Sequence, residues 1–125
     1  MLKKTITYID YNGDERTETH YFDLNEVEAT EMELSVEGGF SKKLQAIAKS
    51  EDKAAMFQVF KNLIEKSYGI KSEDGRRFVK SKQITEEFTQ SKAYVKLIME
   101  LAQDGDKLAA FFNGIIPKVD APAAK

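Results

Sequence analysis

The chain has 125 residues, 42% of them hydrophobic, and a formal net charge of -2, which is typical of a folded domain large enough to bury its own core. It contains no cysteine, which excludes disulfides, thiolate metal sites and a cysteine nucleophile. The sequence pI near 5.5 argues against a general nucleic-acid coat, because that role needs a strongly basic face. No segment approaches the length of a membrane span, so we expect a soluble, intracellular protein that contacts no membrane.

Two segments rich in threonine, tyrosine and isoleucine flank Asn12-Gly13 near the start of the chain. This dipeptide favours a two-residue type I′ turn, so the sequence predicts a β-hairpin over about residues 4–22. The expected faces carry Ile6 and Tyr8 on one side and Ile9 and Phe22 on the other. Because an isolated hairpin is marginal in water, it must pack on the helices or pair with another chain, and its free edge is a candidate for self-association.

The segment from Asp23 to Glu37 contains six acids and no basic residue. Its caps and spacing predict a helix over about residues 26–34, with Val27, Thr30 and Leu34 along one side. The simplest explanation of the acids is a solvated helix face. The functional alternative is an electrostatic dock, either for a basic loop of the same molecule or for a partner.

The most clearly amphipathic helix follows, with apolar residues at spacings of three and four from Met56 to Ile64. Ser50 is expected to cap its start, and Gly69 to end it in a left-handed conformation. The other expected helices begin near Phe40, after Ser81, after Ser91 and near Asp104 or Asp106, and the last one stops before Pro117.

These elements predict an α+β fold that is mostly α-helical, with an N-terminal β-hairpin followed by five or six helices. We expect one domain over residues 1–117, with the helical region at about 24–116 and a flexible tail at 118–125. The predicted common core contains Phe57, Phe60, Leu63, Leu97, Leu101, Phe111 and Phe112.

No residue pattern predicts an enzyme, a cofactor or a metal site. His20 is the only histidine, and neither a phosphate-binding glycine loop nor a serine-nucleophile motif is present. The Asp10–Asp14 segment resembles a calcium loop but has Glu15 where the required glycine would stand. His20 is therefore expected to be structural or on the surface.

A basic loop runs from Lys71 to Lys82 and places Arg76 and Arg77 beside Phe78. Such a cluster is able to grip a phosphate or stack on a base, but Glu73 and Asp74 partly cancel its charge. An internal salt bridge or a protein-binding role is the favoured explanation, and no nucleic-acid partner is expected.

A set of short motifs occurs in order along the chain. They are Thr5-Ile6-Thr7-Tyr8, Asp10-Tyr11-Asn12-Gly13, Glu31-Met32-Glu33-Leu34-Ser35, Glu37-Gly38-Gly39, Phe60-Lys61-Asn62-Leu63-Ile64, Lys66-Ser67-Tyr68-Gly69, Lys71-Ser72-Glu73-Asp74-Gly75-Arg76-Arg77-Phe78, Phe88-Thr89-Gln90-Ser91, Ala93-Tyr94, Met99-Glu100-Leu101-Ala102 and Phe112-Asn113-Gly114-Ile115-Ile116-Pro117. Taken together, they resemble the tail assembly chaperones of long-tailed, siphovirus-type bacteriophages and prophages of Gram-positive bacteria.

The resemblance implies a non-catalytic protein that binds the tape measure protein in the cytoplasm of the bacterial host while the tail tube polymerises. It also implies that the chaperone then leaves and is absent from the mature virion. The major tail protein, a longer frameshifted form of the chain and self-association are further partners to consider. The alternative is a small structural tail or head-tail connector protein of the virion.

The family assigns no contact residues to carry over, so candidates for protein binding come from the residues alone. Exposed hairpin side chains, namely Tyr8, Ile9 and Tyr21, are expected to touch the client or the next copy. The basic loop contributes Arg76, Arg77 and Phe78. The acidic segment and the basic loop are expected to meet head to tail between copies.

Overall fold

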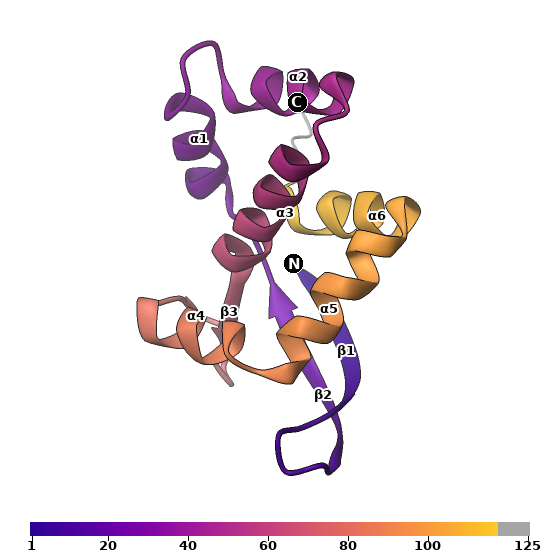
Figure 1. Cartoon of the computed structure of the whole chain (residues 1–125). Helices are drawn as coiled ribbons and strands as arrows, with labels where there is room; N and C mark the ends of the chain where they lie inside the picture. The colour runs from indigo at the N-terminus through magenta and orange to yellow at the C-terminus, as the bar shows by residue number, and fades with distance from the viewer. Residues whose placement is uncertain (118–125) are drawn as a thin grey trace.

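The computed structural model describes residues 1–117, which form a small antiparallel sheet covered on one face by helices (Figure 1). In chain order the elements are β1 (Leu2–Ile9), β2 (Glu15–Phe22), α1 (Glu26–Leu34), α2 (Phe40–Ser50), α3 (Lys53–Ser67), β3 (Tyr68–Lys71), β4 (Phe78–Val79), α4 (Lys82–Thr89), α5 (Lys92–Gln103) and α6 (Gly105–Ile115). The predicted α+β class, mostly helical with an N-terminal hairpin, is confirmed. The tail predicted at 118–125 lies outside the described residues.

The sheet has four strands in the order β1-β2-β3-β4, all neighbours antiparallel. β3 joins β2 through only two residue pairs, Tyr21 with Gly69 and Phe22 with Tyr68. The sequence did not predict this second hairpin, because its strands are very short and β3 starts at the residue after α3 ends. Most of β2 therefore pairs on one side only, and the β1–β2 hairpin projects from the helical body (Figure 1).

The first hairpin closes through a longer turn than Asn12-Gly13 predicted. Ile9 pairs with Glu15, and the Gly13 N–H donates to the Asp10 carbonyl at 3.0 Å. Within this turn, residues 10–14, only Gly13 has a positive φ, +86°. This pattern fits a type I turn followed by a left-handed glycine rather than type I′. The pairing shifts by one residue, and a shift of one residue moves every side chain of a strand to the other face.

That shift corrects the predicted faces of the hairpin. Leu2 pairs with Phe22 and Ile6 pairs with Glu18, so Phe22 shares the inner face with Ile6 and Tyr8. Ile9 alone of the four predicted apolar residues points outward. The inner face is therefore more apolar than expected, and it packs on α5 and α6.

Helix α3 also differs from the sequence-based prediction at both of its ends. Asp52, not Ser50, caps α3 by accepting a hydrogen bond from the Ala55 N–H at 3.1 Å. Gly69 is not a left-handed helix end but lies within β3, where a Cβ atom would come within 2.6 Å of the Phe78 ring. Glycine is required here for close packing rather than for a positive φ.

The buried core lies between the inner face of the sheet and the helices that follow it. Its members are Ile6, Tyr8, Phe22, Leu24, Phe60, Leu63, Ile64, Phe88, Ala93, Leu97, Ile98, Leu101, Phe111 and Ile115. Phe112 packs half-buried against them, but the predicted core position of Phe57 is wrong. All buried residues of α3 lie from Phe60 onward, and Phe57, which is 39% exposed, precedes them in the helix.

Gly114 lies within α6 beside β1, where a Cβ atom would come within 2.9 Å of the Leu2 side chain. Glycine at this position therefore allows a close contact between α6 and β1. Among residues 1–117, no helix is long and apolar enough to span a membrane.

Candidate protein-binding site

The predicted hairpin residues fall on opposite faces of the sheet. Ile9 is 55% exposed on the outer face, and Tyr21 lies there too, half-buried. Tyr21 pairs with Gly69, against which the Phe78 ring packs, so the structure brings Tyr21 and Phe78 together on this face. Threonines cover most of the rest, with Thr5 hydrogen-bonded to Thr19 and Thr7 to Thr17, both at 3.0 Å.

Tyr8 is not the exposed side chain that we expected, because only 9% of it is accessible. Its hydroxyl donates to Glu18 Oε1 at 2.6 Å, and this hydrogen bond, with burial, raises the pKa of Tyr8 to about 12. Tyr8 therefore belongs to the core packing of β1 and offers little surface to a partner.

The basic loop forms a tight turn that holds both arginines out into solvent. The Ser72 hydroxyl donates to Asp74 Oδ1 at 2.7 Å and accepts from the Arg77 N–H at 3.0 Å, while Gly75 adopts a φ of +76°. The Arg76 N–H and the Ser72 hydroxyl hold the pKa of Asp74 below its usual range. Within residues 1–117 neither Arg76 nor Arg77 forms an ion pair.

Lys80, not the arginines, makes the internal contact to the acidic segment. Its ammonium donates to Glu28 Oε2 and to the Asp23 carbonyl, both at 2.7 Å. Glu28 also completes the capping box of α1 by accepting from the Asn25 N–H at 3.0 Å. The contact predicted between the acidic segment and the basic loop of one molecule thus exists at the start of α1, but it is made by Lys80 rather than by Arg76 or Arg77.

The rest of α1 is barely covered by the protein. None of its nine residues is buried, and Val27 and Leu34, predicted to lie on one side of this helix, are 69% and 79% exposed. Met32 is the α1 residue that packs on the core. The expected apolar stripe of Val27, Thr30 and Leu34 therefore faces solvent.

α1 is held to α2 by a side chain that caps the next helix. Glu33 Oε1 accepts hydrogen bonds from the Ser41 N–H and hydroxyl, both at 2.9 Å. These bonds hold the pKa of Glu33 below its usual range. We call these two helices, residues 26–50, the α1–α2 arm.

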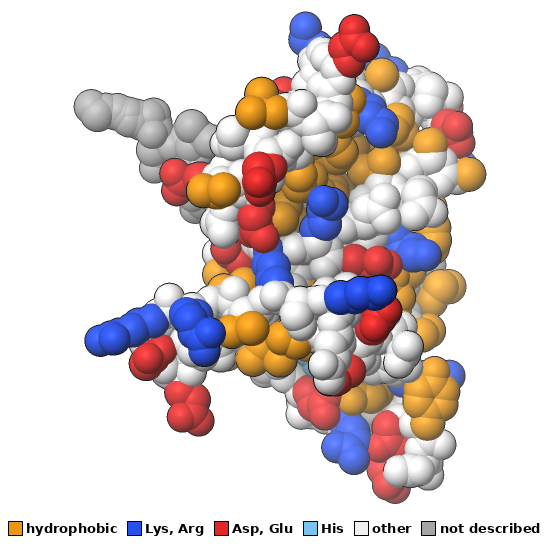
Figure 2. All heavy atoms as spheres, turned by 90° about the vertical axis from the view of Figure 1, so that its left-hand side faces the viewer, with side chains coloured by type: hydrophobic (Ala, Val, Ile, Leu, Met, Phe, Trp, Pro, Cys, Tyr) orange, Lys and Arg blue, Asp and Glu red, His pale blue; other side chains and the backbone are white. Residues whose placement is uncertain are grey.

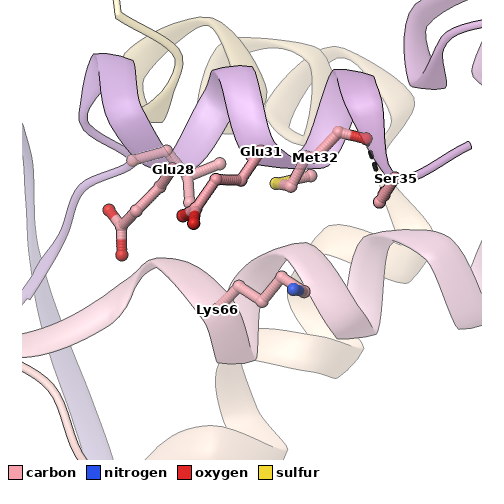
Figure 3. Close-up of a pocket in the computed structure, with 6 residues that line it drawn as sticks. Glu28, Glu31, Met32, Ser35 and Lys66 are labelled. Carbon is pink, nitrogen blue, oxygen red and sulfur yellow. Dashed lines mark hydrogen bonds between the residues drawn. The ribbon is translucent and has the colours of Figure 1, made fainter.

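A hollow of about 350 Å³ lies between α1 and α3. It is lined by Leu24, Glu28, Glu31, Met32, Ser35 and Lys66, with Glu28 and Glu31 reaching from α1 toward α3 (Figure 3). A second hollow, of about 190 Å³, continues it toward α2 and shares Met32, Ser35 and Lys66. We call the two together the α1–α3 groove.

Sequence reasoning missed this groove, because its walls come from two helices, α1 and α3, that are separated in the chain by α2 and whose packing no local pattern predicts. Figure 2 looks onto this side of the molecule and shows hydrophobic side chains set back among acidic and basic ones. The signal that the sequence did carry was the one-sign charge of the Asp23–Glu37 segment.

His20 has the structural environment that we expected for a lone histidine. Its ring lies 5.2 Å from that of Phe88 and 6.0 Å from that of Tyr68. Burial lowers its pKa, and within the described residues its Nε2 atom has no hydrogen-bond partner. Nor do residues 1–117 contain a group of three or more histidine, aspartate or glutamate side chains placed to hold a metal ion.

Comparison with known proteins gives one family. The family model described as phage tail assembly chaperone matches residues 1–122, nearly the whole chain. No curated protein and no solved structure matches the chain. The ordered motifs, the confirmed fold class and this match agree, and the chain therefore belongs to the phage tail assembly chaperone family.

Proposed function

We propose that this chaperone binds the tape measure protein in the host cytoplasm while the tail tube assembles, and then leaves before the virion is complete. The observation that carries the proposal is the family match over residues 1–122. The exposed apolar side chains of α1, Val27 and Leu34, are compatible with it, because they are accessible to a client. Weak contacts repeated along a long client hold it by avidity, yet each copy remains displaceable by the growing tube.

Co-expression with the tape measure protein of the same phage tests this function. We expect a soluble complex with many copies per client by size-exclusion chromatography with light scattering, and an insoluble client when it is expressed alone. A client that is soluble by itself and elutes apart from the chaperone would refute the proposal.

Mass spectrometry of purified virions separates a chaperone from a structural tail or head-tail connector protein, which stays in the particle. We expect no peptides of this chain in mature virions. The same co-expression with the major tail protein, or with a longer frameshifted form of the chain, tests those partners.

Self-association through opposite charges is a further part of this proposal. The Arg76-Arg77 turn is exposed and the Asp23–Glu37 segment is acidic, so one copy's turn is able to meet the next copy's helix. Reversing both arginines to glutamate should lower the sedimentation coefficient at low salt. The matched control reverses two exposed lysines outside the basic loop, Lys53→Glu with Lys96→Glu, and should leave the sedimentation coefficient unchanged.

A further inference from the structure

The charges around the α1–α3 groove differ from one wall to the other. Glu28 and Glu31 stand on the α1 wall, while Lys66 extends from α3, and Lys43 adds a second cation toward α2. Glu28 is neutralised by Lys80 at 2.7 Å. Within residues 1–117, neither Glu31 nor Lys66 forms an ion pair, so each wall keeps a free charge.

The floor of the groove becomes apolar toward α2, in the second hollow. Met32, Phe40 and Val59 line it half-buried, and Leu63 reaches it from the core. The α1 residues that line it run from Glu28 to Ser35, about two helical turns or ~10 Å of wall. A ligand with a short apolar stripe and polar flanks fits this cross-section.

The backbone around the groove favours a helix over an extended strand. Both walls are helices whose interior N–H and C=O groups bond within the helix, so an extended segment would find no main-chain partners there. A helix brings its own backbone bonds and presents only side chains. It also packs between α1 and α3 as a third helix of a bundle does.

We propose that the α1–α3 groove is the docking site for an amphipathic helix of the client, one with an apolar stripe, a basic flank and an acidic flank. The basic flank lies along α1 and meets Glu31, and the acidic flank lies along α3 and meets Lys66. This inference rests on the proposed function, since it takes the tape measure protein as the source of the helix.

Single charge reversals in the full-length chain test the site. Glu31→Lys and Lys66→Glu each place a like charge against one flank of the client, and both positions are exposed, so the fold is retained. The matched controls are Glu87→Lys on α4 and Lys96→Glu on α5, which are exposed and line neither hollow of the groove. Circular dichroism checks folding, and binding is measured to the co-expressed tape measure protein and to overlapping peptides that span it.

At low salt we expect each groove reversal to weaken binding about tenfold, with smaller effects in high salt because screening removes the charge term. The controls should bind as the unaltered chain does. The peptides that bind should carry an apolar stripe at helical spacing between flanks of opposite charge.

Three results would overturn the site, and they are distinguishable from each other. If Glu31→Lys and Lys66→Glu bind the client as well as the controls do, the groove proposal is wrong while the chaperone function stands. If the unaltered chain binds no tape measure protein, both proposals are wrong. If the groove variants change sedimentation of the chain alone, the groove takes a second copy instead.

Discussion

The α1–α2 arm and the sheet-based body of this chaperone follow opposite packing rules. The body joins strands β1 to β4 with α4 to α6 and the second half of α3, and it holds nearly all the fully buried side chains. The arm has no buried residue in α1, and it contacts the body mainly through half-buried Met32 and Phe40. The arm helices are similar in length to α4, α5 and α6 of the body, so helix length does not explain the difference.

The comparison teaches where stability and binding are expected to reside. Burial of apolar area is the main source of folding free energy, so the body should dominate unfolding. A region with few buried contacts opens locally at low cost and keeps apolar surface free for a partner. The following predictions test this division, from the largest expected effect to the smallest.

Phe22→Ala should have the largest effect on stability. Phe22 is completely buried, and its ring lies 5.1 Å from that of Phe111 and 5.8 Å from that of Phe88. The cavity should lower the free energy of unfolding by about 3–5 kcal/mol in urea titrations. The matched control Leu34→Ala in the arm should change it by less than about 0.5 kcal/mol. Similar losses from both would contradict the division.

Gly69→Ala should be the next most harmful change. The added Cβ would lie 2.6 Å from the Phe78 ring, so either that ring or the β3–β4 backbone must shift, at an expected cost of about 1–3 kcal/mol in urea unfolding. Gly105→Ala is the control, because it has open space at the start of α6 and should be neutral or stabilise by up to about 1 kcal/mol. A neutral Gly69→Ala would show that the Phe78 ring moves aside freely.

Acid should destabilise the body through His20. Its pKa is lowered in the folded state by burial, so below about pH 6.5 the unfolded chain binds the proton more readily and stability falls. Uptake of one such proton on unfolding changes the free energy of unfolding by at most about 1.4 kcal/mol per pH unit. Urea unfolding at pH 7.5 and 5.5 measures the loss, and His20→Phe should reduce it. An equal loss in the variant would assign the pH dependence to other groups.

Lys80→Met should loosen α1 more than the body. It removes the bonds to Glu28 and to the Asp23 carbonyl, which we expect to cost about 1 kcal/mol. Amide hydrogen exchange should speed up in α1 while α5 is unchanged. Lys82→Met serves as the control, since Lys82 is exposed and forms no ion pair within the described residues. Equal acceleration in both helices would mean that arm and body open together.

Several local features were predictable because a few neighbouring residues determine them. Ser81, Ser91 and Asp104 cap α4, α5 and α6 as expected, each accepting hydrogen bonds from N–H groups within the following three residues. The bounds of α1 and the overall class were also predicted correctly. Caps and helical spacing operate over a single turn, so the sequence displays them directly.

The candidate site was predicted less well. The sequence indicated the acidic segment and the basic turn, and the structure leaves Arg76 and Arg77 exposed and without an ion pair among the described residues. In the structure Tyr8 is buried, and Lys80 rather than an arginine bonds to Glu28. Strand register decides the first position and the packing of distant segments decides the second, so the sequence predicted neither. The groove was not predictable, since α1 and α3 face each other only in the folded chain.

The sequence by itself determined the family, the helix boundaries set by caps, and the charge of the acidic segment. The tertiary structure decided which faces are covered: it turned Phe22 inward, left Val27 and Leu34 in solvent, and opened the groove beside Lys66. The physical reason is the range of the interactions. Capping and helical periodicity are local, whereas burial depends on which distant segment packs against a face, and residues 1–117 supply almost no such segment for α1.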